Sequence, residues 1–489
     1  MSIRAKTAAP AMKHAISGAS VIAAQMSIAP GTTTVPYRVI ALSRDRTTFY
    51  AVYSGTSGRK NGIAKSMDGG VTWTNIRNFA AISANVDLVA FLELPSGEVI
   101  IALSSFGTFP AQIYKSTGWA ANPATATFSL KTTLIGGSLT QGYSMNPTCM
   151  GSNGVLLASE SGPQTAAPSG LAITNAGTGY TSMTLAATSG GTGEDIRVYL
   201  LAGKIERIGI INGGTGHTNG TFSFGITGDG TSAAVTYTVS GGVISGVQTA
   251  TARRLFLSTD FGNTWTNIYD IYLSPTYKYG VGVHIHACAY DEAWDRIWLQ
   301  FGDNTGDGLK ISGSPTNTQI LYSDDRGVTW TFLPAEQYLT ASGVQAQYTS
   351  IRIYKDNIVF GADAQYDWCM VVFPRTGYRQ LGNAEFATGA TLKGSGIAGA
   401  QISAYSADDS LPVFSTYALT STGVENPVVC TSDAGSTWYE FWRETDLVTR
   451  PAIANGGPSA FYGPDTSNRI VANYYGYNAL ITGALVTNL

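Results

Sequence analysis

The sequence has few charged residues, and it has no long basic or apolar run. Charged residues make up 12% of the 489 positions, about half of the usual share, and the formal net charge is −3. Because a basic run is missing, a nucleic-acid partner is not expected. No stretch reaches the roughly 18 apolar residues of a membrane helix, so no membrane span is expected either.

Cysteine is also scarce. The four cysteines are Cys149, Cys288, Cys369 and Cys430; they lie far apart and form no Cys-x-x-Cys pair, which excludes a zinc site of the usual spacing. Cys288, Cys369 and Cys430 stand in apolar runs typical of strands. We therefore expect buried free thiols.

A recognisable secretory signal is missing as well. The first 26 residues carry charges but no continuous apolar block before a cleavage site. Gly (57 residues) and Tyr (26 residues) are plentiful, which is typical of short strands joined by tight turns. This composition without an export signal is expected of a virion component released by cell lysis, or of another extracellular protein.

One segment of eight residues occurs four times: SMDGGVTW (66–73), STDFGNTW (258–265), SDDRGVTW (323–330) and TSDAGSTW (431–438). Each copy lies between two runs typical of strands. Its Asp-x-Gly element favours a turn, because Asp accepts hydrogen bonds from backbone N–H groups ahead of it and Gly adopts positive φ. The Trp is large enough to close the hairpin against its neighbour. The residues predicted to hold these turns are Ser66, Asp68, Gly70, Trp73, Ser258, Asp260, Gly262, Trp265, Ser323, Asp325, Gly327, Trp330, Thr431, Asp433, Gly435 and Trp438.

The four segments resemble the Asp-box (BNR repeat) of sialidases and other β-propeller proteins, with the pattern Ser/Thr-x-Asp-x-Gly-x-Thr-Trp/Phe. The resemblance implies an all-β fold, a propeller in which each box joins the third and fourth strands of a blade. It also implies that ligands bind at the other face, around the central funnel.

The spacing of the boxes indicates an insertion. Asp260 and Asp325 are 65 positions apart, and Asp325 and Asp433 are 108 apart, or two steps of 54, but Asp68 and Asp260 are 192 apart. Within that long gap, ITNAGTGYTS (173–182) recurs as IINGGTGHTN (210–219). Removing residues 165–250 reduces the gap to 106 positions, again two steps of about 53.

Residues 165–250 are therefore predicted to be a small inserted β domain, made of two β units in tandem, between the second and third strands of a blade. This segment also resembles the Gly/Thr-rich β repeats of phage tail and other virion proteins. The insert is expected beside the mouth of the funnel.

At about 50 residues a blade, the chain predicts seven blades, and six with looser ends is the alternative. Residues 1–15 form an N-terminal extension, 16–164 the first part of the propeller, and 251–489 its second part. A strand within residues 20–28 is expected to join three C-terminal strands and close the ring.

A candidate ligand-binding arginine lies near the start of the propeller. VPYRVIAL (35–42) resembles the Tyr/Phe-Arg-Ile-Pro motif of sialidases, whose arginine is one of three that hold the substrate carboxylate. Arg38 matches that arginine, although Ile40 stands in place of the proline. A guanidinium pairs with a carboxylate through two hydrogen bonds. Arg352 and Arg450 begin runs typical of strands and are candidates to complete the set.

The catalytic residues of a sialidase are not recognised. In that family an Asp acid/base lies in the loop after the second strand of the first blade, but residues 54–62 contain no Asp or Glu. The nucleophile would be a Tyr activated by a Glu, and no pair is assigned by motif. Enzymatic activity is therefore not favoured, and the catalytic residues are unknown.

Two further segments carry polar side chains suited to chemistry. His284 and His286, at i and i+2, face one side of a strand, where they contact the funnel or pack structurally. Asp303 and Asp307, in GDNTGDG (302–308), are weak calcium candidates, with a plain turn as the alternative. No metal site and no cofactor is expected.

Three functions remain open from the sequence. The favoured one is a phage tail fibre or receptor-binding virion protein that binds host-surface glycan, without catalysis, and contacts other virion proteins; a homo-oligomer stays open. The alternative is a sialidase-type glycoside hydrolase acting on sialosides, capsule or lipopolysaccharide. The third is a secreted, lectin-like propeller.

Overall fold

The structure is a computed structural model that contains almost only strands and turns. It describes residues 25–28, 37–54, 59–82, 87–105, 109–134, 149–159, 171–201, 203–245, 254–270, 284–302, 319–332, 348–353, 357–362, 370–374, 391–393, 400–402, 413–416, 427–430, 439–443, 460–462, 465–467, 469–474 and 477–482. In these ranges helical structure is limited to the 3-10 turn η2 (Phe79–Ala81) and a 3-10 residue at Cys149, and no described helix is long and apolar enough to cross a membrane. The expectation of an all-β chain is confirmed.

Two four-stranded antiparallel sheets come first in the chain. The first sheet contains β2 (Tyr37–Leu42), β3 (Phe49–Tyr53), β4 (Gly62–Ser66) and β5 (Thr74–Asn78). The second contains β6 (Asp87–Glu93), β7 (Val99–Ser105), β8 (Phe109–Thr117) and β9 (Thr127–Leu134). In both, sequence order equals spatial order, so each connection is a hairpin.

The third sheet is interrupted in sequence. Its strands are β10 (Leu156–Ser159), β19 (Arg254–Ser258) and β20 (Thr266–Asp270), and Met150 forms an isolated bridge to Leu156 at its edge. β10 and β19 pair directly although some 95 residues separate them in the chain.

Three more four-stranded sheets follow, again in sequence order. The fourth contains β21 (His284–Asp291), β22 (Arg296–Gly302), β23 (Gln319–Ser323) and β24 (Thr331–Phe332). The fifth contains β25 (Tyr348–Ile353), β26 (Asn357–Ala362), β27 (Met370–Pro374) and β28 (Thr391–Lys393). The sixth contains β29 (Ala400–Ile402), β30 (Val413–Thr416), β31 (Pro427–Cys430) and β32 (Tyr439–Arg443).

The last sheet joins both ends of the described chain. Its strands are β33 (Ala460–Tyr462), β34 (Arg469–Tyr474), β35 (Tyr477–Thr482) and β1 (Gln25–Ile28). β1 pairs antiparallel with β35, so a strand from the N-terminal segment completes a sheet of C-terminal strands.

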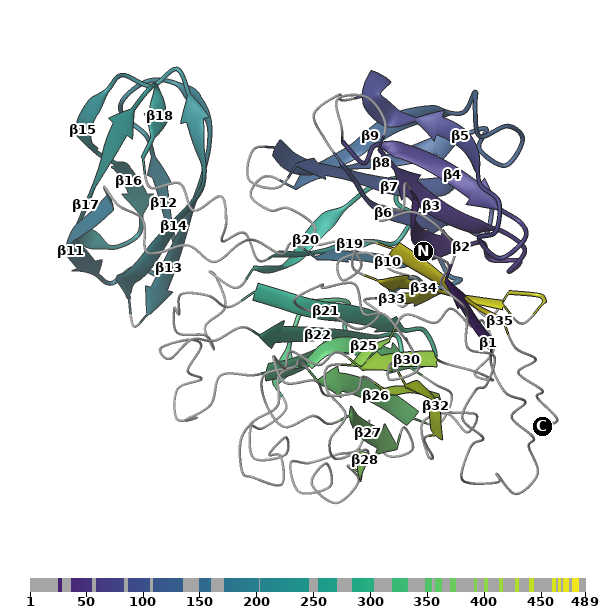
Figure 1. Cartoon of the computed structure of the whole chain (residues 1–489). Coiled ribbons are helices and arrows are strands. Elements are labelled where there is room, and N and C mark those ends of the chain that lie inside the picture. Colours follow the sequence, from purple (N-terminus) through teal and green to yellow (C-terminus); the bar gives the residue numbers. More distant parts are fainter. Residues whose placement is uncertain are drawn as a thin grey trace.

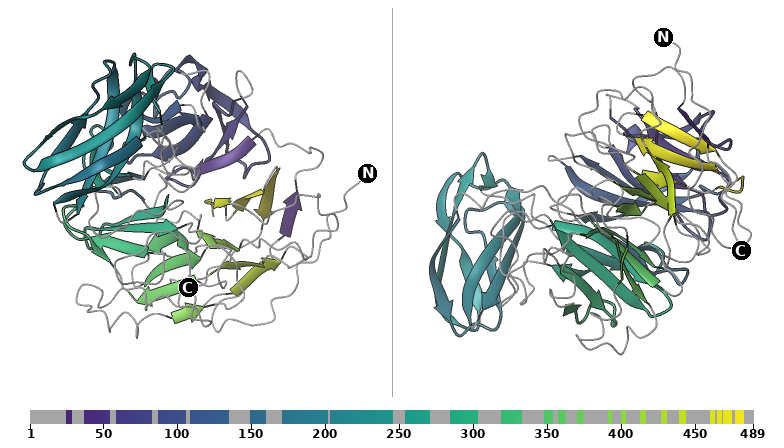
Figure 2. Two further views of the ribbon diagram at one scale, coloured as in Figure 1. Left: turned by 90° about the vertical axis from the view of Figure 1, so that its left-hand side faces the viewer. Right: turned by 60° about the horizontal axis from the view of Figure 1, so that its bottom comes forward.

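The sheets follow one another around a common centre in sequence order (Figure 2, left). The first strand of each sheet contacts that of the next in the pairs β2 with β6, β21 with β25, β25 with β29, β29 with β33, and β33 with β2. β10 of the third sheet contacts β21. The arrangement therefore returns to its starting sheet.

Apolar residues on both faces of the strands hold neighbouring sheets together. In β7, Val99, Ile101 and Leu103 pack in a cluster with side chains of the first sheet, whereas Ile100 and Ala102 pack with residues of the third sheet. Successive residues of a strand point to opposite faces, so this strand is buried on both sides.

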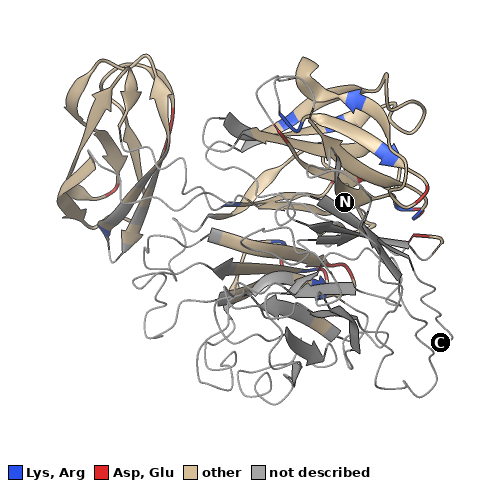
Figure 3. Cartoon of the chain, in the orientation of Figure 1, with Lys and Arg blue, Asp and Glu red and all other residues tan. Residues whose placement is uncertain are grey.

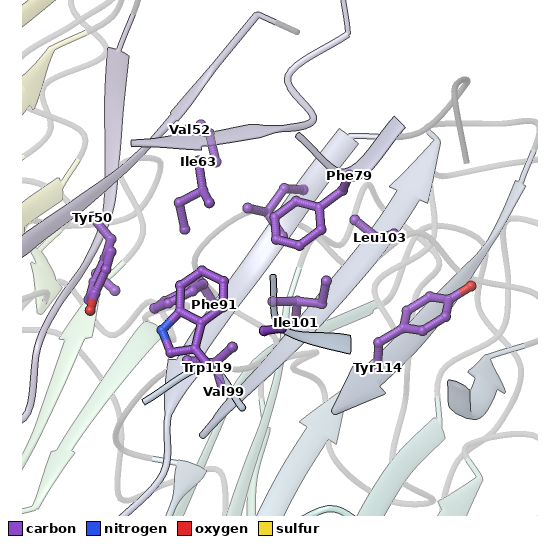
Figure 4. Close-up of a cluster of buried hydrophobic side chains, with 13 residues drawn as sticks. Tyr50, Val52, Ile63, Phe79, Phe91, Val99, Ile101, Leu103, Tyr114 and Trp119 are labelled. Atoms are coloured by element: carbon purple, nitrogen blue, oxygen red, sulfur yellow. The ribbon is translucent and has the colours of Figure 1, made fainter. Parts of the chain in front are cut away.

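Aromatic rings fill the space between the first and second sheets (Figure 4). The ring centroids of Tyr50 and Phe91 are 4.7 Å apart, and those of Phe91 and Trp119 are 5.6 Å apart. Phe79 and Trp119 are almost fully buried. Burying each of these side chains contributes about 1.5–3 kcal/mol, which makes this contact a large part of the local stability.

The segment between β10 and β19 forms sheets of its own, which lie apart from the others (Figure 1). Its strands are β11 (Leu171–Thr178), β12 (Met183–Ala186), β13 (Thr192–Leu201), β14 (Lys204–Thr215), β15 (Gly220–Ser223), β16 (Gly225–Gly228), β17 (Thr231–Ser240) and β18 (Val243–Ile244). Its buried side chains form one separate cluster around Tyr237.

The expectation of two β units in tandem within this segment is wrong. β11 and β12 come from the first copy of the repeat and pair with β17 and β16 from the second. β14 begins in the first copy and continues into the second, and it pairs with β13 of the first copy along both parts. Neither copy can bury its apolar face alone, so the duplication builds one unit rather than two.

Candidate functional site at one end of the sheets

Antiparallel strands in sequence order give each four-stranded sheet two different ends. One end carries the connections from first to second strand and from third to fourth strand. We call it the box end, because it holds residues 66–73, 258–265 and 323–330. The other end, called the opposite end, carries the start of the first strand and the second-to-third connection.

At the box end, the repeated segments are hydrogen-bonded to themselves. The Ser66 hydroxyl donates to Asp68 over 2.7 Å and accepts from the N–H of Gly70 over 2.8 Å. The N–H of Thr72 donates to Asp68 over 2.9 Å, and Trp73 Nε1 donates to the Gly70 carbonyl over 3.0 Å. Residues 258–265 and 323–330 repeat these bonds, while Thr431, Asp433, Gly435 and Trp438 lie outside the described residues.

These bonds change the titration of the box carboxylates. Partial burial raises the pKa of Asp68, Asp260 and Asp325, but hydrogen bonds from a Thr side chain, from backbone N–H groups and from the Ser hydroxyl outweigh it. The pKa of each therefore lies below its ordinary value of 3.8.

The second sheet holds its box end by a different route. Ser116 occupies the place of the box serine, and its hydroxyl donates to Glu98, which comes from the β6–β7 turn. Glu98 also accepts from the N–H groups of Gly118 (2.8 Å) and Trp119 (3.1 Å). Glu98 thus supplies the carboxylate that an Asp within the turn supplies elsewhere, a substitution that the sequence pattern did not reveal.

A β-bulge marks equivalent positions in four first strands. One extra residue interrupts the pairing at Ile40 in β2, Val89 in β6, His286 in β21 and Thr349 in β25. Bulges bend a strand and re-aim its side chains next to functional sites. Because the bulge recurs, residues of different first strands can be compared by their distance from it along the chain.

Counted from the bulge, three residues with functional side chains occupy one position. Arg38, Asp87 and His284 each lie two residues before the bulge, at the starts of β2, β6 and β21. Since β2 contacts β6, the backbones of Arg38 and Asp87 lie on adjacent strands. The structure therefore places an arginine and an aspartate at equivalent backbone positions of two contacting strands at the opposite end, and His284 takes the same position in the fourth sheet.

Asp87 is the residue that sequence reasoning missed. Its Oδ1 accepts a hydrogen bond of 2.7 Å from the N–H of Lys60, and its Oδ2 lies 3.7 Å from the guanidinium of Arg59. The N–H of Leu88 donates to the Lys60 carbonyl over 2.9 Å. Asp87 thus contacts the β3–β4 connection, which lacks its own carboxylate. Its chain position, 27 residues after Lys60, carries no motif that would have announced this contact.

Buried polar atoms without a partner lie near the same end. Asn61, Ser104 and Gln300 are 0%, 2% and 1% exposed, and their side chains have no hydrogen-bond partner in the described part of the chain. Asn61 directly precedes β4, while Ser104 and Gln300 lie within three residues of the ends of β7 and β22. An unmade hydrogen bond at a buried group costs about 1–3 kcal/mol, and a bound ligand or water is a usual reason for one.

The other predicted ligand residues do not join this group. Arg352 lies three residues after the bulge of β25, not at the strand's start, so it is five residues further along than the position of Arg38. At about 3.3 Å per residue, that is about 16 Å along the strand. The expectation that Arg352 lies near a strand start is therefore wrong. Arg450, Asp303 and Asp307 lie outside the described residues.

His286 is the extra residue of its bulge and is 5% exposed. The simple alternation that would place it on the same side as His284 is interrupted at this point. Among the described residues, no group of three His, Cys, Asp or Glu side chains is placed to hold a metal ion.

The segment 171–245 contacts the third sheet at this end. Arg254, at the start of β19, donates to Asp195 of β13 over 3.4 Å, and its guanidinium stacks 5.2 Å from the ring of Phe256. Arg254 is 5% exposed. This contact joins β13 of the inserted segment to β19 of the third sheet.

A Ser–His–Glu group occurs inside the same segment. Ser189 Oγ lies 3.0 Å from His217 Nδ1, and His217 Nε2 lies 3.8 Å from Glu194. The hydroxyl of Tyr237 donates to Ser189, which is 4% exposed. The buried hydroxyl is held within the core, so the group serves to join the turns that follow β12 and β14 to β13 and β17 rather than to attack a substrate.

No protein-family model matches the sequence, and no curated protein sequence matches it. Among solved structures, a leech intramolecular trans-sialidase in complex with 2,7-anhydro-Neu5Ac is similar with a TM-score of 0.38 and 15% identity, over 80% of this chain and 65% of that chain. An ulvan lyase of polysaccharide lyase family 25 has a TM-score of 0.40 and 9% identity, over 92% and 96%. A prolyl endopeptidase has a TM-score of 0.33 and 12% identity, over 83% of this chain and 50% of that chain. This chain therefore spans half the length of the prolyl endopeptidase and less than two thirds of the length of the leech trans-sialidase.

Proposed function

We propose that the chain is a seven-bladed Asp-box β-propeller with a small β domain inserted in its third blade, and that its opposite end binds a host-surface glycan without catalysis. The ring of sheets, closed by β1, supports the blade number. The domain boundaries at 165 and 250 are supported by the separate core of residues 171–245.

The position shared by Arg38, Asp87 and His284 carries the proposal. Sugar hydroxyls both donate and accept, so a site that binds them presents cationic donors and carboxylate acceptors side by side. Arg38 and Asp87 are of these two kinds and lie on contacting strands. The buried, unpartnered amide of Asn61 adds a donor and an acceptor near the same end.

Asp87 supports binding rather than acid/base catalysis. Its Oδ1 is already bonded to the Lys60 N–H, and its Oδ2 faces Arg59. A general acid needs an oxygen free to reach the leaving group, and these contacts instead use Asp87 to position the β3–β4 connection.

The test is a screen of immobilised sialylated, capsular and lipopolysaccharide glycans, with the wild-type protein beside Arg38→Ala and Arg38→Lys. We expect binding that Arg38→Ala weakens at least tenfold and Arg38→Lys restores in part, because Lys keeps the charge but not the fork geometry. Binding that neither variant changes would contradict a site at this position.

The narrower proposal is a virion role, as a tail fibre or receptor-binding component that contacts other virion proteins. It rests on the low share of charged residues and on the Gly/Thr-rich repeat of residues 173–219. Deleting residues 1–15 is expected to abolish incorporation into particles while glycan binding persists. Normal incorporation of the deletion variant would contradict it.

A sialidase-type hydrolase is the second candidate, and Asp87 is the observation in its favour. It brings a carboxylate to the connection where that family carries its acid/base. Turnover of a fluorogenic sialoside that Asp87→Asn abolishes would establish this alternative. Binding without turnover leaves the lectin-like propeller and the virion protein, which the particle experiment separates.

A further inference from the structure

Two buried thiols meet where the third sheet contacts the fourth. Cys149 precedes the edge bridge of the third sheet, and Cys288 lies in β21. Their Sγ atoms are 3.4 Å apart, and the Cys149 thiol also lies 3.2 Å from the Cys288 carbonyl. Both are almost fully buried, at 0% and 1% exposed. Neither residue takes part in the proposed binding site.

Hydrogen bonds on the chain beside Cys149 hold this contact in place. Asn153 Nδ2 donates to the hydroxyl of Tyr290 over 2.8 Å, and the N–H of Ser152 donates to Glu292 over 2.8 Å. Each bond joins the segment after Cys149 to the segment after Cys288. The two sulfur atoms are thus kept close by contacts that do not involve sulfur.

We infer that Cys149 and Cys288 form a disulfide under oxidising conditions and that this bond staples the third sheet to the fourth. The oxidant is a small-molecule disulfide such as oxidised glutathione. One cysteine thiolate displaces one thiol from it to give a mixed disulfide, and the second cysteine then displaces the other thiol. Each cysteine loses one proton and one electron, and the oxidant is released as two thiols.

The staple would close a loop of 139 residues. That loop contains β10, the whole segment 171–245, β19 and β20. A cut within the segment would then leave both halves of the ring covalently joined. A bond that closes so long a loop also restricts the unfolded chain strongly.

Burial makes oxidation of the folded protein slow. A hydrogen bond with Cys149, together with burial, raises the pKa of the Cys288 thiol well above its usual value, which lowers the fraction of reactive thiolate. A small-molecule disulfide reaches the two thiols only when the contact between the third and fourth sheets opens. Oxidation is therefore expected during folding, when the two segments have met but the small-molecule disulfide still reaches the thiols.

The experiment refolds the reduced, denatured protein in a glutathione redox buffer and maps disulfides by mass spectrometry without reductant. We expect one dominant pair, Cys149 with Cys288, with a mass lower by two hydrogens and a Tm higher by a few degrees that reductant reverses. Cys369→Ser should retain the pair and its shift, whereas Cys149→Ser should lose both.

Random pairing provides the contrasting result. Cys369 and Cys430 are 61 positions apart, so an unstructured chain would close that shorter loop more readily than the 139-residue loop. Dominance of the Cys369–Cys430 pair, or thiols that stay free after refolding, would overturn the inference.

A protease site introduced at residues 165–168 gives an independent readout. After cleavage, the oxidised protein should run as one band without reductant and as two bands with it. Two bands under both conditions, from protein refolded in the redox buffer, would also overturn the staple.

Discussion

The box end and the opposite end of the sheets are built in different ways. At the box end, the repeated turns 66–73, 258–265 and 323–330 are each closed by residues at most four positions apart, such as Ser66, Asp68 and Thr72. At the opposite end, the contacts join separate sheets, as between Asp87 and Lys60. Charged residues are sparse along the described part of the ribbon (Figure 3). The comparison teaches that the local turns define the scaffold, while the long-range contacts define the candidate site.

The largest effect on stability is expected at the box end of the fourth sheet. Arg296 is 1% exposed, donates to both oxygens of Asp324 over 2.6 and 2.8 Å, and stacks 3.9 Å from the ring of Tyr322. Arg296→Ala should lower the free energy of unfolding by about 3 kcal/mol, the low end for a buried pair because Asp324 is half exposed.

Chemical denaturation measures that change, with Asp324→Asn as the control. The control should cost about 1 kcal/mol, since the Arg296 side chain keeps its aromatic neighbours. Equal losses in both variants would mean that the ion pair, and not the packing, holds this end.

A glycine pair tests whether the box turns need close packing between sheets. Gly327 has φ +94°, and a Cβ there would lie 2.5 Å from Cβ of Ile268 in the preceding sheet. Gly118 has φ +86° with nothing within 4 Å. Gly327→Ala should cost about 2–3 kcal/mol and Gly118→Ala about 1 kcal/mol in thermal or denaturant unfolding. Equal costs would show that backbone strain alone matters.

The box carboxylates predict how stability depends on pH. Their folded pKa values lie below 3.8, so the unfolded chain binds more protons in acid. The stability they contribute is fully present above pH 3.8 and is lost as the pH falls through the folded values. Denaturant midpoints should therefore drop between pH 5 and pH 2.5 in the wild type, and less steeply in the triple variant Asp68→Asn, Asp260→Asn, Asp325→Asn. Denaturant midpoints that fall equally steeply with pH in the wild type and the triple variant would contradict a contribution from these three carboxylates.

The smallest effect is expected where the inserted segment meets the ring. Arg254→Ala and Asp195→Ala should each lower global stability by about 1 kcal/mol, because the 3.4 Å contact is long for a hydrogen bond and the inserted segment has a separate core. Hydrogen exchange in β13 and β19 should increase in both variants and no further in the double variant. Additive increases would mean that the two residues act separately.

The contrast between the two ends also explains what could be predicted. The box turns were readable because Ser258, Asp260 and Trp265 act within one short segment. Arg38 was proposed from its neighbours Tyr37 and Val39, and it lies in the first strand of its sheet. Asp87 and Glu98 were missed because each works across a gap of some 20 to 30 residues, so no local pattern records their partners. The pairing of strands between the two repeat copies is likewise set by tertiary packing, which the repeated sequence does not record.

The most direct test of a binding site at the opposite end compares one carboxylate from each end. Asp87→Ala and Asp68→Ala are made in parallel, and glycan affinity is measured at a temperature where both variants are folded. We expect Asp87→Ala to lose at least tenfold in affinity with little loss of stability, while Asp68→Ala loses about 1–3 kcal/mol of stability and keeps its affinity. Retained affinity in Asp87→Ala, or lost affinity in a folded Asp68→Ala, would contradict a binding site at the opposite end.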